Sequence, residues 1–120
     1  MVEARELTSA EMFVLHRVCE SVEDTAEREI GIAQIAAARW KGPSDHNDQC
    51  FEVTVSADAP LLDIQNGPFG SLLWYEGDDL VSMIHAWVVD GRLTSYEQSW
   101  ETDRLPGVED DLRLDLGPSA

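Results

Sequence analysis

Residues 81–100, VSMIHAWVVDGRLTSYEQSW, decide the fold class of this chain. Two runs rich in β-branched and aromatic side chains are joined by Asp90-Gly91, a pair that favours a type I′ turn with positive φ at both positions. The stretch therefore predicts a β-hairpin. A two-residue loop places the following residues opposite one another on one face: Val89 and Arg92, Trp87 and Thr94, His85 and Tyr96, Val81 and Trp100.

Both faces of this hairpin carry apolar side chains. Val88, Leu93, Ala86, Ser95, Ile84 and Glu97 share the second face. One face is expected to pack against helices, and the other to bind something or to be covered by the C-terminal tail. The pattern leaves open which face does which.

The segment upstream of the hairpin predicts two helices followed by strands. Thr8 and Glu11 have the spacing of a capping box, and the apolar residues Met12, Leu15, Val18, Cys19 and Val22 follow on one helical face, which predicts a helix over 9–22. A second, short helix is predicted over 24–34, although Gly31 interrupts it. Strands are predicted over 35–40, 50–55 and 70–75.

The C-terminal residues alternate leucines with charges, at Leu112, Leu114 and Leu116. They form either a final edge strand or a frayed terminus, and residues 107–120 are interpreted as a partly ordered acidic tail. The whole chain is predicted to be one α+β domain, 1–120. Two N-terminal helices pack on a mostly antiparallel sheet of four or five strands that ends in the hairpin.

The charge balance narrows the possible partners. Eight basic residues against 24 acidic ones give a net charge of −16 and a pI near 4.2. Such a field speeds encounter with basic proteins and repels nucleic-acid phosphates and anionic lipid, so we expect a basic protein partner, no nucleic acid and no membrane. The alternative is an acidity shared by a whole proteome. The N-terminal residues lack a basic region followed by an apolar one, which predicts a cytoplasmic protein.

The three histidines are the first candidates for catalytic or metal-binding groups. His16 is interpreted as a half-buried helix residue. The loop Asp45-His46-Asn47-Asp48 offers metal ligands but has no second cluster, so a solvated turn is favoured. A proton-handling pair of His85 and Tyr96 is possible in an aromatic patch, but a packed core is favoured.

Other catalytic signatures are weak. Glu97 and Glu101 fall on one strand face without defining a sugar cleft, and the chain has no P-loop, dinucleotide-binding glycine fingerprint, GxSxG or CxxC. Cys19 and Cys50 are expected to be buried and reduced. We therefore predict that the protein is not an enzyme and needs no cofactor and no metal.

The end of the hairpin region carries a family resemblance. Asp90-Gly91-Arg92-Leu93, Tyr96-Glu97, Trp100, Asp103, Leu105 and Pro106 are similar to the ending of a family of small actinobacterial proteins whose biochemical role is not established. Relatives often carry a cysteine cluster before the strand at residue 50, whereas only Cys50 stands here. By size, charge and architecture alone, the chain also resembles immunity proteins of bacterial polymorphic toxin systems, which occlude the active site of a toxin.

These observations predict a binding protein of the immunity or inhibitor type that covers a basic cleft on a toxin or nuclease domain. Glu109, Asp110 and Asp111 are further candidates for the acidic part of the partner-binding surface. A homodimer and a binder of a small cationic ligand remain alternatives, so the chain is expected to be a monomer or a homodimer. The predicted partner-binding residues are Trp74, Tyr75, Asp78, Asp79, Trp87, Tyr96, Glu97, Trp100, Glu101 and Asp103.

Overall fold

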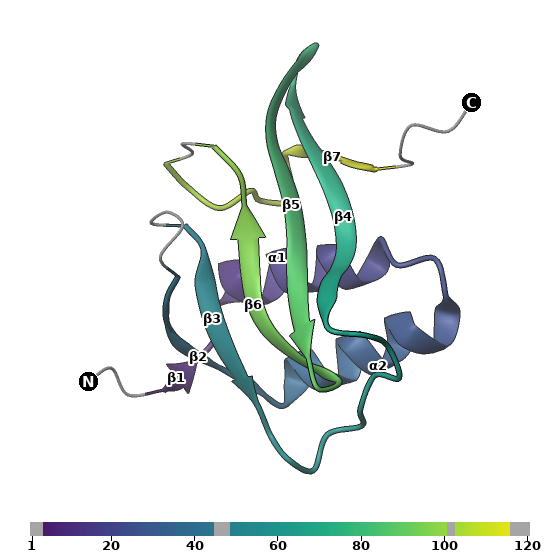
Figure 1. Ribbon diagram of the computed structural model, residues 1–120. Coiled ribbons are helices and arrows are strands. Elements are labelled where there is room, and N and C mark those ends of the chain that lie inside the picture. The colour runs from purple at the N-terminus through teal and green to yellow at the C-terminus, as the bar shows by residue number, and fades with distance from the viewer. Residues whose placement is uncertain (1–3, 45–48, 101–102, 116–120) are drawn as a thin grey trace.

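A computed structural model describes residues 4–44, 49–100 and 103–115. They form two helices and a seven-stranded antiparallel sheet with the strand order β1-β2-β3-β6-β5-β4-β7 (Figure 1). This confirms the α+β class, but the expected four or five strands are too few. The elements are β1 Arg5–Glu6, α1 Ser9–Glu20, α2 Thr25–Ala36, β2 Ala38–Pro43, β3 Phe51–Val55, β4 Gly67–Glu76, β5 Asp79–Val89, β6 Arg92–Gln98 and β7 Asp111–Leu114.

The additional strands lie at the two edges of the sheet. β1 pairs with β2, and β7 pairs with β4, so that Tyr75 faces Asp111. Of the two alternatives for the tail, residues 111–114 adopt the edge strand, while residues 116–120 lie outside the described residues. Short strands of this kind carry too little hydrophobic alternation to be recognised without their neighbours.

Helix α1 begins as its sequence predicts. The Thr8 hydroxyl accepts from the Glu11 N–H at 3.1 Å, and the Glu11 carboxylate accepts from the Thr8 N–H at 2.9 Å. Arg5 also donates to this carboxylate. The predicted apolar face is wrong in one position, because Met12 is 41% exposed and Val14 takes its place in the core.

Helix α2 continues through Gly31, and the glycine allows close packing at this position. A Cβ at this position would lie 2.8 Å from the Phe69 ring and 2.9 Å from Cys19 Sγ. The missing side chain therefore lets α1, α2 and β4 approach closely. The helix ends at Ala36, so the strand predicted over 35–40 begins later, at Ala38.

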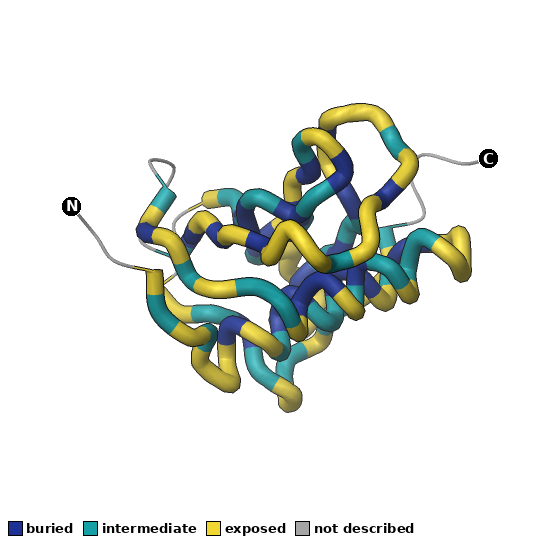
Figure 2. Tube along the Cα trace, turned by 90° about the horizontal axis from the view of Figure 1, so that it is seen from below, coloured by how far each residue is buried: buried dark blue, intermediate teal, exposed yellow. Residues whose placement is uncertain are grey.

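The helices cover one face of the sheet and leave the other uncovered. In β5 the even-numbered residues Ser82, Ile84, Ala86 and Val88 are buried toward the helices, while the odd-numbered ones are half-buried or exposed. Buried positions concentrate between the two layers (Figure 2). The core is therefore one layer thick and lies on the helix side.

The hairpin of β5 and β6 departs from the predicted pairing after its second residue pair, Val88 with Leu93. Asp90 and Gly91 have φ of 52° and 79°, which confirms a turn with two positive φ angles. Val88 pairs with Leu93, but Trp87 pairs with Ser95, so Thr94 is an extra residue. This β-bulge reverses the orientation of every later residue in β6.

One buried side chain of α2 holds the turn of this hairpin in place. Gln34 donates to the carbonyls of Pro60 and Gly91 and accepts from the N–H of Leu93 at 2.9 Å. A Cβ on Gly91 would lie 2.7 Å from the Leu62 carbonyl oxygen, so the close approach also requires glycine. Gln34 thereby fixes the hairpin relative to the helices.

Candidate functional site

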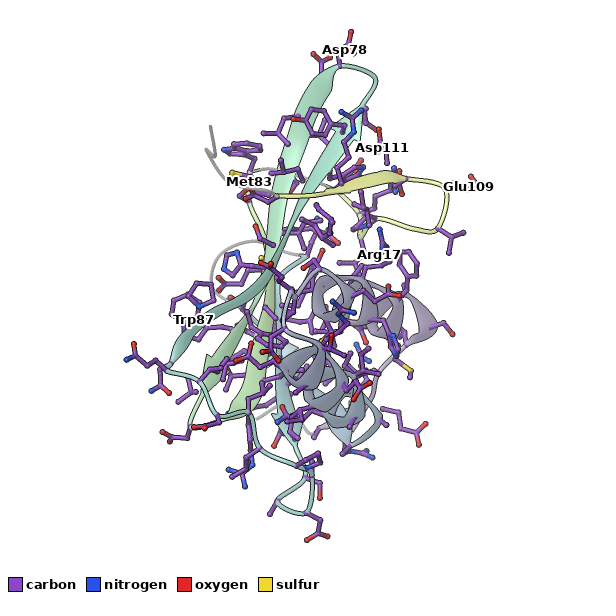
Figure 3. All side chains as sticks on the ribbon, turned by 90° about the vertical axis from the view of Figure 1, so that its right-hand side faces the viewer. Arg17, Asp78, Met83, Trp87, Glu109 and Asp111 are labelled. Carbon is purple, nitrogen blue, oxygen red and sulfur yellow. The ribbon has the colours of Figure 1, made fainter. Side chains whose placement is uncertain are left out.

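The uncovered side of the sheet, which we call the open face, carries large apolar side chains in contact with solvent. Met83 and Trp87 are 41% and 38% exposed and point away from the helices (Figure 3). Cross-strand partners share a face, which adds residues of β3, β4 and β6 to these two. The open face includes Glu52, Pro68, Leu73, Met83, His85, Trp87, Ser95 and Glu97. The same pairing adds Arg92 opposite Val89, Arg39 opposite Thr54, and Arg113 of β7 opposite Leu73.

A polar pair lies at the middle of the open face. His85 Nε2 is 3.0 Å from Glu97 Oε1, across the β5–β6 pair. The His85 ring is also tilted against Trp87, with 6.1 Å between ring centroids. The pair is partly open to solvent, since the side chains of His85 and Glu97 are 33% and 21% exposed. The prediction that Glu97 lies on the face opposite His85 is therefore wrong.

Tyr96 lies on the helix side of the sheet, so the prediction that it faces His85 is also wrong. It is fully buried, stacks on Phe51 with 5.2 Å between ring centroids, and donates to Gln98 Oε1 at 2.7 Å. Gln98 in turn donates to the carbonyl of Arg104. Burial raises the pKa of the Tyr96 phenol well above its ordinary value. Tyr96 thus belongs to the core and does not reach a partner.

Trp74 is also buried, at 3% exposed, beneath the loop that leads to β7. The Arg104 guanidinium lies 4.9 Å above the indole ring and donates to Asp110 at 2.7 Å. Hydrogen bonds from Arg104 and from the Gly107 N–H lower the pKa of Asp110 to about 2. The predicted residues Trp74 and Asp110 therefore hold this loop, and Asp103 is exposed beside it.

The predicted residues Tyr75, Asp78 and Asp79 come together on a projection of the sheet. We call the part of the β4–β5 hairpin from Leu73 to Met83 the arm. Its turn has positive φ at Gly77, and its exposed tip reaches beyond both neighbouring strands (Figures 1 and 3). The Arg113 guanidinium stacks on the Tyr75 ring at 4.0 Å.

Trp100 follows the end of β6 and is 53% exposed. Its predicted pairing with Val81 does not form, because the last pair between the strands is Ile84 with Gln98. Trp100 has a φ of 64°, which turns the chain away from β5. Glu101 lies outside the described residues, as do His46 and its flanking loop, 45–48.

The structure also places groups that sequence reasoning left out. Leu80 and Met83 are exposed on the arm, and a shallow cavity of about 380 Å³ lies beside Leu7, Met12 and Ile35 at the end of α2. Strand alternation does not predict the orientation of Leu80. Val81 is an extra residue in β5, and this bulge turns Leu80 onto the same face as Tyr75. Only a register assigned from the structure reveals it.

The two cysteines are buried, as predicted. Burial raises the pKa of the Cys19 thiol to about 12. The Cys50 thiol donates to the Gln98 carbonyl oxygen at 3.4 Å, and its sulfur accepts from the Gln98 N–H at 3.3 Å. Within residues 4–44, 49–100 and 103–115, no three His, Cys, Asp or Glu side chains gather as metal ligands would.

Comparison with known proteins adds no relative. No family model, no curated protein and no solved structure matches this chain. Among the described helices, neither is long and apolar enough to cross a membrane.

Proposed function

We propose that this protein is a non-enzymatic binding protein of the immunity or inhibitor type, which receives a basic protein partner on its open face. The observation that supports the proposal is the exposure of Trp87 and Met83 at 38% and 41% on the uncovered side of the sheet. Large side chains left in water on one contiguous face are typical of an interaction surface. Tryptophan is also the residue most enriched among those that dominate binding energy.

Charge supports a basic partner. The net charge is −16, and exposed Glu52 and partly exposed Glu97 lie on the open face beside the apolar side chains. Asp78 and Asp79 add exposed carboxylates at the end of the arm. Arg39, Arg92 and Arg113 also lie on this side of the sheet, so the attraction toward a basic surface comes from the net charge of the whole protein and from the arm carboxylates. Desolvated contacts with the apolar side chains hold the partner after docking.

The partner class follows from this complementarity. A toxin or nuclease domain that acts on phosphate-containing substrates needs a basic cleft, and an acidic protein of this size covers such a cleft. Two copies of this chain repel one another through the same charge, so a basic partner is favoured over a homodimer. No metal or cofactor enters the proposed role.

The test is a pull-down of the tagged protein from its native cells at about 50 mM and about 300 mM sodium chloride, which shortens the range of the field. A basic protein retained at low salt and weakened by added salt is expected. Affinity for the purified partner is then measured for Trp87→Ala, which should bind about 30-fold more weakly.

The matched control is Val108→Ala, because Val108 is 82% exposed in the loop before β7. This loop lies on the helix side of the sheet (Figure 3). The control should bind as the wild type does. Equal binding by both variants would contradict the open face as the docking surface. Recovery of the protein alone, as a dimer insensitive to salt, would replace the proposal with self-association.

A further inference from the structure

The arm has a strand edge that lacks a neighbour. β5 begins at Asp79, but its last pair with β6 is Ile84 with Gln98, after which the Ser99 N–H donates to the Met83 carbonyl. Ser82, which is fully buried, donates from its hydroxyl to the Ser99 carbonyl at 2.9 Å. Beyond this point, none of the described residues pairs with 79–81 on the β6 side, while β4 pairs on the other side. Figure 1 shows β5 and β4 rising together above the end of β6.

An unpaired edge of this kind is a template for a further strand, because its N–H and C=O groups are available to an extended segment. Residues 79–81 give a length of roughly 10 Å, and the N–H and C=O groups that point away from β4 are the ones open to a new strand. The bulge at Val81 places exposed Leu80 on the same face as Met83. An added strand would therefore lie beside two apolar side chains as well as a free backbone.

The charges at the tip determine which strand fits. Glu76, Asp78 and Asp79 are exposed around the turn. The nearby Arg113 is engaged with Asp111 at 2.8 Å on the opposite edge of the arm, beside β4. Carboxylates on an edge prevent pairing with a second acidic copy, which is how many proteins avoid self-association. The same carboxylates favour an extended segment rich in lysine or arginine.

We propose that the free edge of the arm binds an extended basic segment of the partner by strand addition, next to β5 residues 79–81. The inference rests on the proposed function for the basic character of the partner, but it assigns an adjoining surface, which shares Met83 with the open face, and a backbone mode of recognition. Alternating cationic and apolar residues would suit this edge, since one set meets the tip carboxylates and the other meets Leu80 and Met83.

The experiment uses the full chain, labelled with nitrogen-15, and an eight-residue peptide of alternating lysine and valine with blocked termini. Amide resonances of 79–83 are expected to shift on titration at low salt. The same peptide with every backbone amide methylated keeps its charge but cannot pair as a strand, and should bind at least about tenfold more weakly. Equal binding by the methylated peptide would overturn strand addition.

A charge-reversal variant provides the second test. Asp78→Lys with Asp79→Lys changes only exposed positions at the tip and should bind the peptide about tenfold more weakly. The matched control, Asp58→Lys with Glu109→Lys, has the same net charge at exposed positions away from the arm and should retain binding. Equal losses of peptide affinity in both variants would mean that only the net charge of the protein attracts the peptide, and would overturn the inference.

The location of the shifts separates this inference from the proposed function. Shifts confined to Trp87 and Glu97, with 79–83 unchanged, would leave the open face as a binding surface and overturn the free edge as one. Shifts confined to 79–83 would support the edge while leaving the open face to the Trp87→Ala test. An absence of shifts anywhere at millimolar peptide would overturn the edge inference alone.

Discussion

The imidazole Nε2 of His85 lies 3.0 Å from Oε1 of Glu97, directly across the β5–β6 pair. The contact exists because Thr94 is an extra residue in β6, which turns Tyr96 into the core and Glu97 out of it. Both side chains of the pair are partly exposed. The centre of the open face is therefore polar and accessible, with Trp87 beside it.

The His85–Glu97 pair is expected to contribute little to folding. Solvent screens partly exposed charges, so a double-mutant cycle of His85→Ala and Glu97→Ala should give a coupling energy below about 1 kcal/mol at pH 6. Urea unfolding of the wild type, both single variants and the double variant measures it. A coupling of several kcal/mol would show that the pair is structural, and would remove it from the accessible surface that a partner meets.

Tyr96→Phe should destabilise the fold by about 1–2 kcal/mol, because Gln98 Oε1 would lose the buried donor that lies 2.7 Å away. The stacking on Phe51 is retained in the variant. Chemical denaturation measures the change. Tyr75→Phe, on the half-buried ring of the arm, is the control and should change stability by less than about 0.5 kcal/mol. Equal effects of the two substitutions would refute a structural role for the Tyr96 hydroxyl.

The stability contributed by Asp110 should disappear in acid. Its pKa of about 2 lies below the ordinary value near 3.9, so the folded state binds this proton more weakly than the unfolded state. The contribution is complete above about pH 5 and is lost as the pH falls from about 4 to about 2.

Comparison with Asp110→Asn checks this. Because Arg104 is half-exposed, solvent limits the difference in unfolding free energy to about 1 kcal/mol at pH 7. The two proteins should converge in stability toward pH 2. A difference that stays constant through acidification would contradict the role of the Arg104–Asp110 contact.

Gly31→Ala should destabilise the protein by about 1–3 kcal/mol, against the usual preference of a helix for alanine. The added Cβ would lie 2.8 Å from the Phe69 ring and 2.9 Å from Cys19 Sγ, between α1, α2 and β4. Thermal unfolding measures the loss. Glu29→Ala, at an exposed position of the same helix, should be nearly neutral. A stabilised Gly31→Ala variant would mean that the helices separate easily.

Local chemistry is the part of this fold that could be predicted from sequence. The capping box of Thr8 and Glu11 and the turn at Asp90-Gly91 formed as expected, since each depends on residues no more than a few positions apart. Helix α1 ended two residues before the predicted boundary at 22. Trp87, Asp78 and Asp79 are exposed, and their role in binding a partner stays a prediction.

Burial is where the predicted site differs from the structure. Trp74 and Tyr96 were expected at a partner surface and lie in the interior instead, while Leu80 and Met83 were not expected there and are exposed. Residue type alone does not separate these cases, because an aromatic side chain suits both a core and an interface. The surrounding elements decide which one it joins.

The sequence by itself determined the α+β class, the helix start, the hairpin turn and a surface of strongly negative charge. Tertiary structure decided which side of the sheet the helices cover, the edge strands β1 and β7, and the bulges at Val81 and Thr94. A bulge disturbs the local ladder and is stable only when distant contacts offset that cost. In β6 those contacts are Tyr96 with Phe51 and Gln34 with Leu93, which join segments far apart in the chain.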